Sequence, residues 1–177
     1  DSRSDADDEQ KRKALKEWDT STAYLRTVGD LMVAAFFNSK KQKGREQLKQ
    51  IYLEATLENR TAEALEEALS EQLKGLREGD NGLQPLHWQL AFPDVFSRPE
   101  PGFDVFVGNP PFIGGRKMKA ALGEAFQNWL QDKFRDSSAN CDLSAFFFLR
   151  CHQLLRPGGS FGLIATNTIA QGDTRST

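Results

Sequence analysis

The residues of this chain best suited to chemistry are Asn109, Pro110, Pro111 and Phe112, which follow one another directly. Asn109 Oδ1 and the Pro110 carbonyl oxygen are hydrogen-bond acceptors, and neither proline has a backbone N–H that would compete for them. Phe112 offers a flat apolar ring on which a base can stack once it has turned out of its own stack. The acceptors suit the exocyclic amine of a purine. The four residues therefore predict a site that orients an NH₂ group for methylation.

The elements around this turn are predicted to form a strand–helix–strand unit. The apolar run just before the turn is typical of a buried parallel strand, and Asp142 is the expected N-cap of a later helix. The predicted strand, two helices and second buried strand span residues 103–108, 117–134, 142–155 and 160–166. In an open parallel sheet, ligands bind beyond the carboxyl ends of the strands. The turn is predicted to lie at such an end.

The residues before position 80 are predicted to be helical. The Asp-rich start, residues 1–10, lacks apolar anchors and is predicted to be disordered. Apolar side chains then recur at three- and four-residue steps and predict the buried face of a long helix. These side chains are Leu15, Trp18, Leu25, Val28, Met32 and Phe36. Thr61 is the expected N-cap of a further helix. A turn signal at 79–82 separates a helical segment, 1–80, from the part with chemistry, 81–177.

Composition limits the function classes. The chain has 177 residues, of which 27% are charged and 38% hydrophobic, with a net charge of −2. These values fit a folded globular protein, and the charge disfavours strong DNA binding by this chain alone. No apolar run reaches the roughly 18–20 residues that span a bilayer, and no secretory signal opens the chain, so a cytoplasmic protein without a membrane partner is predicted. His87 and His152 lack metal-ligand spacing to Cys141 or Cys151, so no metal site is predicted.

Residues 103–115 resemble the catalytic motif of amino-group methyltransferases that use S-adenosylmethionine, in particular the N6-adenine DNA enzymes. Further segments resemble large bacterial type IIG restriction–modification and phage-defence methyltransferases; these are residues 86–96, 116–130, 142–159 and 162–173. The resemblance implies an α/β fold, namely part of a Rossmann-like S-adenosylmethionine-dependent methyltransferase core preceded by a helical segment. It also implies that Asn109 and Pro110 accept hydrogen bonds from the target N6 amine. Pro111 would complete the rigid turn, and Phe112 would stack on a flipped adenine of double-stranded DNA.

Two further groups of residues are candidates for binding. Trp88 and Gly108 are candidates for contact with the methyl donor, although packing under the loop at 93–101 is the favoured interpretation of Trp88. Three basic residues just beyond the turn are candidates for contact with DNA phosphates, or they form the solvated start of a helix. They are Arg116, Lys117 and Lys119.

The chain departs from the resembling enzymes at the donor site. Their strand followed by a Gly-rich turn has no counterpart before residue 108, and no residue stands out as the acid that holds the ribose of the donor. The chain is therefore expected to be an internal part of a larger enzyme, completed by N- and C-terminal parts, and to be inactive by itself. Two alternatives stay open. One is methylation of an RNA base or a protein glutamine, which present a similar NH₂. The other is a non-catalytic scaffold with a vestigial methyltransferase half.

Overall fold

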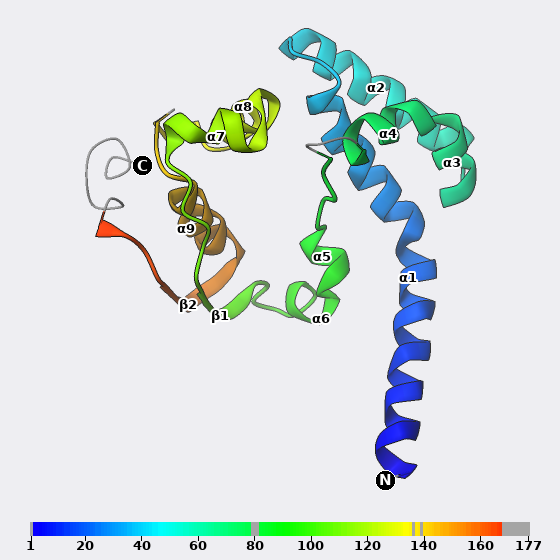
Figure 1. Cartoon of the computed structure of the whole chain (residues 1–177). Helices are drawn as coiled ribbons and strands as arrows, with labels where there is room; N and C mark the ends of the chain where they lie inside the picture. The colour runs from blue at the N-terminus through cyan, green and yellow to red at the C-terminus, as the bar shows by residue number, and fades with distance from the viewer. Residues whose placement is uncertain (1, 79–81, 136, 139, 168–177) are drawn as a thin grey trace. The chain divides into compact units, whose positions relative to one another are not determined.

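The computed structural model of the chain describes residues 2–78, 82–135, 137–138 and 140–167, with side chains from residue 7 onward. The chain, drawn in Figure 1, divides into two compact units, Asp1–Leu90 and Ala91–Thr177. Each unit has its own hydrophobic core. The turn predicted at 79–82 lies mostly outside the described residues. The predicted division of the full protein into domains at 80/81 stays a prediction.

The first unit is helical. Its main helices are α1 (Ser2–Phe37), α2 (Gln42–Glu58), α3 (Ala62–Ala68) and α4 (Ser70–Arg77). Thr61 caps α3 as predicted, because its side chain accepts a hydrogen bond from Ala64 N at 3.2 Å. The four helices enclose a core of Leu31, Ala34, Ala35, Tyr52, Leu65, Leu69, Leu73 and Leu76.

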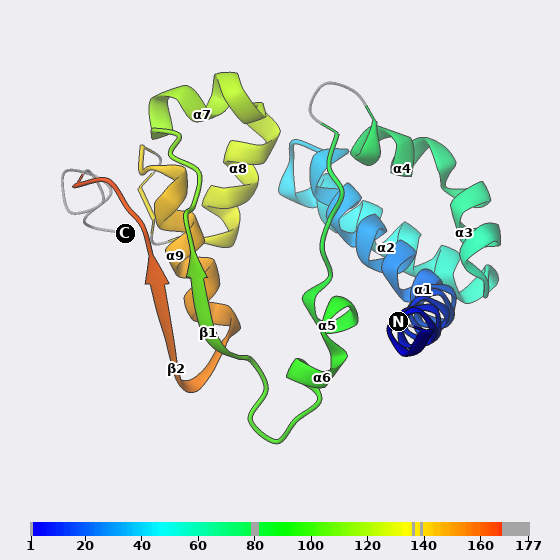
Figure 2. The same cartoon turned by 60° about the horizontal axis from the view of Figure 1, so that its bottom comes forward.

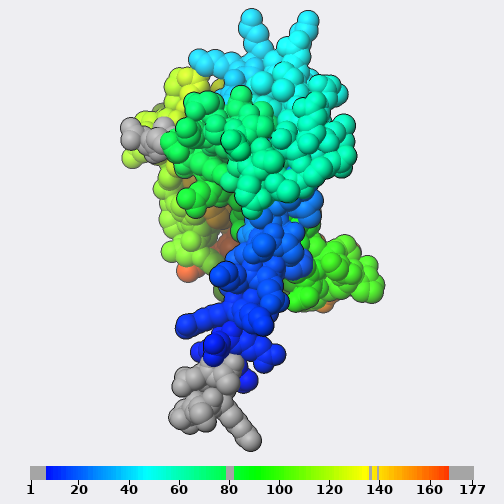
Figure 3. All heavy atoms as spheres, turned by 90° about the vertical axis from the view of Figure 1, so that its right-hand side faces the viewer, coloured from blue at the N-terminus to red at the C-terminus, as the bar shows by residue number. Residues whose placement is uncertain are grey.

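Helix α1 differs from its prediction at both its start and its buried face. It begins at Ser2 rather than after residue 10, and no glycine or proline interrupts the sequence from there to Gly29. Leu15, Trp18 and Leu25 are exposed. The buried positions of α1 begin only at Thr22, after Leu15 and Trp18, and Leu25 is not among them. In Figure 3 the blue N-terminal part of α1 extends away from α2, α3 and α4.

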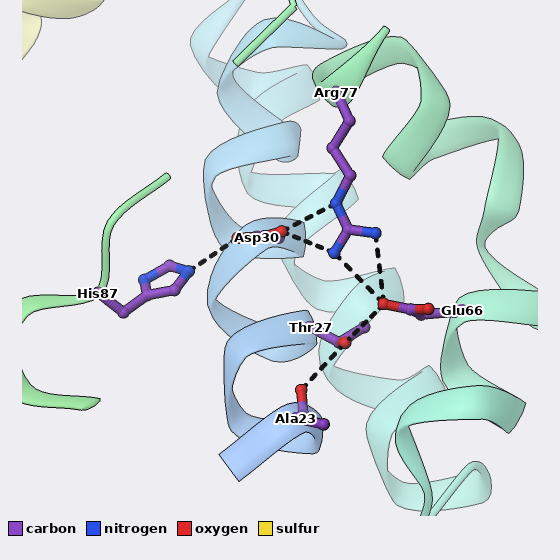
Figure 4. A network of polar contacts seen from close by, with 6 residues as sticks. All are labelled: Ala23, Thr27, Asp30, Glu66, Arg77 and His87. Carbon is purple, nitrogen blue, oxygen red and sulfur yellow. Dashed lines mark hydrogen bonds and ion pairs between the residues drawn. The ribbon is translucent and has the colours of Figure 1, made fainter. Parts of the chain in front are cut away.

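A polar network lies among the helices of this unit (Figure 4). Asp30, only 7% exposed, accepts hydrogen bonds from Arg77 Nε at 3.0 Å and Nη2 at 2.7 Å, and its other oxygen lies 2.8 Å from His87 Nε2. Glu66 Oε1 accepts from Thr27 Oγ1 at 3.0 Å and lies 3.3 Å from Arg77 Nη1. Burial lowers the pKa of Arg77, but hydrogen bonds and the charge of Asp30 outweigh it, so that pKa is raised. The network joins α1, α3, α4 and the segment that carries His87.

The strand predicted over residues 86–92 is wrong. The structure has a short helix there, α5 (Trp88–Ala91), and Leu90 N donates to His87 O at 2.9 Å. Trp18 Nε1 donates to Leu90 O at 2.9 Å and fastens this helix to α1. Hydrophobicity in so short a run does not distinguish a strand from a helix. Another short helix, α6 (Pro93–Phe96), follows in the second unit.

The described residues of the second unit contain a two-stranded parallel sheet (Figure 2). Strand β1 (Phe103–Gly108) has the predicted bounds. Strand β2 (Leu155–Leu163) begins five residues before its predicted start at position 160. The register shifts between Phe103, which pairs with Leu155, and Val105, which pairs with Ser160. The residues between Leu155 and Ser160 therefore form a bulge inside β2, and Gly158 permits it with φ +75°.

The sheet is covered on one face only within the part of the chain that the structure describes. Phe161 lies opposite Phe106 in the register and contacts Phe148 of α9 (Leu143–Leu154), with ring centroids 5.5 Å apart. On the other face Val105 is 57% and Val107 84% exposed. The prediction of a buried strand is thus wrong for this face, which we call the open face. A parallel strand is buried on both sides only when helices cover both.

The helices between the strands follow the prediction with one break. The expected helix at 117–134 is two helices, α7 (Gly115–Leu122) and α8 (Glu124–Lys133). They meet at Gly123, whose φ of +85° is favourable only for glycine. Asp142 caps α9 as predicted, because its Oδ1 accepts from Ser144 N at 2.9 Å. The core of this unit contains Met118, Leu130, Phe134, Cys141, Leu143, Ala145 and Phe146.

Candidate active site

The Asn-Pro-Pro-Phe turn lies at the carboxyl end of β1. Gly108, the last residue of the strand, pairs with Leu163 at the carboxyl end of β2. Its carbonyl oxygen accepts a hydrogen bond from Ile164 N at 3.0 Å. The chain thus leaves the sheet from a fixed point. Asn109 is the first residue beyond it, at the edge where open parallel sheets bind ligands.

The turn buries one proline and presents its other side chains. Pro110 is buried, whereas Asn109 and Pro111 are exposed and the Phe112 ring is 42% exposed. The Phe112 ring therefore does not fill the core of the unit. Among the described residues, no hydrogen bond occupies the Asn109 carboxamide and no aromatic ring contacts Phe112. An acceptor and a flat apolar face are thus both free to meet a ligand.

Just beyond the turn, the backbone is fastened to the start of α9. Ile113 O accepts a hydrogen bond from Leu143 N at 2.9 Å, and the Ile113 side chain packs against the core of the unit. The next two residues, Gly114 and Gly115, are both glycines, and their residue type alone predicts a flexible backbone. The sequence carried no signal for this attachment, because its partner lies about 30 residues further along the chain.

The predicted phosphate-binding residues lie on α7 and are all exposed. Lys119 Nζ forms an ion pair with Glu124 Oε2 at 2.9 Å. Arg116 and Lys117 have no acidic partner within the described residues. These two positive charges are therefore the more available for an anion.

An ion cluster fastens the amino end of β1, away from the turn. Arg156 Nε donates to Asp104 Oδ1 at 2.5 Å, and both terminal nitrogens of Arg98 lie 3.1 Å from Asp104 Oδ2. The hydrogen bond from Arg156, followed by that from Arg98, holds the pKa of the exposed Asp104 carboxyl below its ordinary value. The cluster joins β1 to the bulge of β2 and plays no direct part in the candidate site.

The two candidates for donor contact fall in different units. Trp88 begins α5 in the first unit, and Gly108 ends β1 in the second. A side chain at Gly108 would meet only Leu163 Cδ2, at an ordinary 3.7 Å. No packing contact within the described protein therefore requires glycine at position 108.

No group of three His, Cys, Asp or Glu side chains in the described part of the chain is arranged to hold a metal ion. Nor does any described helix combine the length and the apolar character needed to cross a membrane.

A family model described as Eco57I restriction-modification methylase matches residues 11–177, which is nearly the whole chain. The chain belongs to this family. The Eco57I methylase match confirms the resemblance to methyltransferases of restriction–modification systems, and it spans the helical first unit as well as the sheet. No curated protein and no solved structure gives a significant match.

Proposed function

We propose that this chain carries the target-base site of a DNA methyltransferase that transfers a methyl group from S-adenosylmethionine to adenine N6. One observation carries the proposal. In a member of a methylase family, an exposed carboxamide, a proline carbonyl and a free aromatic ring follow directly on a parallel strand, at its carboxyl end.

The chemistry of the turn follows from its acceptors. Asn109 Oδ1 and Pro110 O accept the two hydrogens of an exocyclic amine, and this fixes the direction of the nitrogen lone pair. S-adenosylmethionine supplies an electrophilic methyl group when bound. Orientation and electrostatics then contribute most of the rate, as in other sites that hold two reactants in line. Phe112 holds the flipped base by stacking, an interaction worth about 1–3 kcal/mol per base.

We infer that the two strands belong to a larger, Rossmann-like sheet in the complete protein. The described sheet has only two strands, fewer than a sheet of independent stability. Its open face also lacks the helices that cover a parallel sheet, since Val105 and Val107 are exposed. The donor contacts are then supplied mainly by residues outside this chain, with Trp88 and Gly108 as secondary candidates. This accords with the lack of a Gly-rich turn after a strand before residue 108.

The test is the modified base itself. The protein is expressed from its complete gene in a host without adenine methyltransferases, and nucleosides from the DNA are analysed by mass spectrometry. We expect N6-methyladenine with the gene and none with the empty vector. Radiolabelled methyl groups in RNA or in protein glutamine, with DNA unlabelled, would establish the alternative substrates. A host unlabelled in all three fractions would favour the scaffold.

The membership in a restriction–modification family favours DNA over RNA or protein. Arg116 and Lys117 add a way to test this, because neither cation of α7 has an acidic partner among the described residues. Contact with one phosphate each would contribute about 0.9 to the slope of log K against log salt concentration.

We therefore expect the double variant Arg116→Gln/Lys117→Gln to lower that slope by roughly 2. Fluorescence anisotropy of a labelled duplex, measured at several salt concentrations, gives the slope. Lys133→Gln is the matched control, since Lys133 is an exposed lysine on α8. An equal slope for the double variant and the control would remove α7 from the DNA interface.

A further inference from the structure

We propose that Gly115 is a positioning residue of the candidate active site, and that its close contact with the backbone at Asn140 sets the direction of the Phe112 ring. This inference rests on the proposed methyltransferase function. Gly115 itself touches neither the base nor the donor. It acts through Ile113 and Gly114, the two residues between it and Phe112.

The contact at Gly115 excludes any side chain. A Cβ atom at this position would lie 2.4 Å from both the carbonyl carbon and the carbonyl oxygen of Asn140. Both atoms belong to the backbone, so no side-chain rotation can relieve the overlap. Gly115 is buried and starts α7. Position 115 therefore requires glycine because there is no room for a side chain. One of the two backbone segments must move if the residue is enlarged.

The segment that would move is tied to the turn. Ile113 O accepts from Leu143 N at 2.9 Å, two residues before Gly115. The position of Leu143 is in turn fixed by the start of α9, where Asp142 Oδ1 accepts from Ser144 N at 2.9 Å. Residues 113–115 thus meet residues 140–143 at two points. A displacement at Gly115 strains the bond at Ile113, and Phe112 is the next residue along.

The other end of the turn is held separately, by the 3.0 Å hydrogen bond from Ile164 N to Gly108 O. Residues 109–112 therefore span two fixed points, one on the sheet and one on α9. With the sheet end fixed, a change at Gly115 rotates the turn rather than translating it. A misplacement of about 1 Å in the reacting groups can reduce a rate roughly a hundredfold.

Gly114 provides a matched control in the adjacent position. A Cβ there would meet nothing within 4 Å, and its φ of −59° and ψ of 143° are open to any residue. Gly114→Ala and Gly115→Ala add the same methyl group one residue apart. Only the second forces α7 and the 140–143 segment apart.

The experiment compares steady-state methylation by the complete protein and these two variants. Tritiated S-adenosylmethionine is the donor and unmethylated bacterial DNA the acceptor, with rates normalised to the folded fraction measured by circular dichroism. We expect Gly115→Ala to lower kcat about ten- to a hundredfold with the KM for the donor within about threefold. Gly114→Ala should stay within about twofold of the unaltered protein. A loss of folded protein alone would leave the normalised kcat unchanged, and that result, or equal kcat for both variants, overturns the inference.

A second pair of variants applies if Gly115→Ala does not fold. Asp142→Ala removes the cap that fixes Leu143, whereas Asp142→Asn keeps an oxygen that accepts from Ser144 N. We expect a reduced kcat in the alanine variant and recovery in the asparagine variant. Equal kcat for both would overturn the inference.

If the unaltered protein labels no DNA, the proposed function fails and this inference with it. If the unaltered protein labels DNA and the variants keep its kcat, the proposed function stands and only this inference fails.

Discussion

Replacing Asn109 by alanine should lower N6-methyladenine formation about 10²- to 10³-fold, the usual effect of removing one oriented polar group from a reaction site. Asn109 is exposed and follows the last residue of β1, so the substitution removes an acceptor without opening the core. The stability of the protein should stay within about 0.5 kcal/mol of the original, as for most exposed positions. Mass spectrometry of nucleosides from host DNA measures the modified base.

Asn128→Ala is the matched control for this variant. Asn128 is also exposed but lies on α8, away from the turn. Asn109→Asp should retain more activity than Asn109→Ala, because a carboxylate keeps an acceptor at the same position. Normal methylation by the alanine variant would show that the amine is bound elsewhere.

The second large effect is expected on stability. Asp30→Ala should destabilise the first unit by about 3–5 kcal/mol, because it leaves the half-buried cation of Arg77 without its closest partner. The two atoms of Asp30 and Arg77 in closest contact are 2.7 Å apart, and the Asp30 side chain is 10% exposed. His87 would lose its contact as well. Urea unfolding followed by circular dichroism at 222 nm gives the free energy.

Asp19→Ala is the control for the charge change. Asp19 also pairs with an arginine, Arg26, at 2.9 Å, but its side chain is 51% exposed. A surface pair of this kind contributes at most about 1 kcal/mol. Similar unfolding energies for the two variants would mean that burial of Asp30 adds nothing to the strength of its bonds.

Those parts of the fold that were predicted correctly from the sequence depend on interactions between residues close together in the chain. The bounds of β1 and the caps at Thr61 and Asp142 follow from short-range chemistry, since each cap bonds a backbone N–H two or three residues away. The position of the candidate turn was predictable for the same reason. Its four residues are contiguous and follow directly on a recognisable strand.

Those parts of the fold that could not be predicted from the sequence depend on contacts between residues far apart in the chain. The bulge of β2 forms where Arg156 reaches Asp104, 52 residues earlier. Residue types alone also predicted that Val105 and Val107 are buried, yet burial depends on what covers the open face. The type of Gly115 predicted flexibility, whereas the nearby backbone of Asn140 leaves no room for a side chain at this position. The donor contacts were not predictable because no local motif before residue 108 marks them.

The contact between Gly115 and Asn140 has an evolutionary consequence. It involves only backbone atoms on the Asn140 side, so it restricts the residue type at one of its two positions. Among descendants of this gene, position 115 can accept no mutation that adds a side chain, whereas position 140 can drift. The pair should therefore show no compensating substitutions. Methods that detect contacts through correlated mutation would therefore pass over this contact.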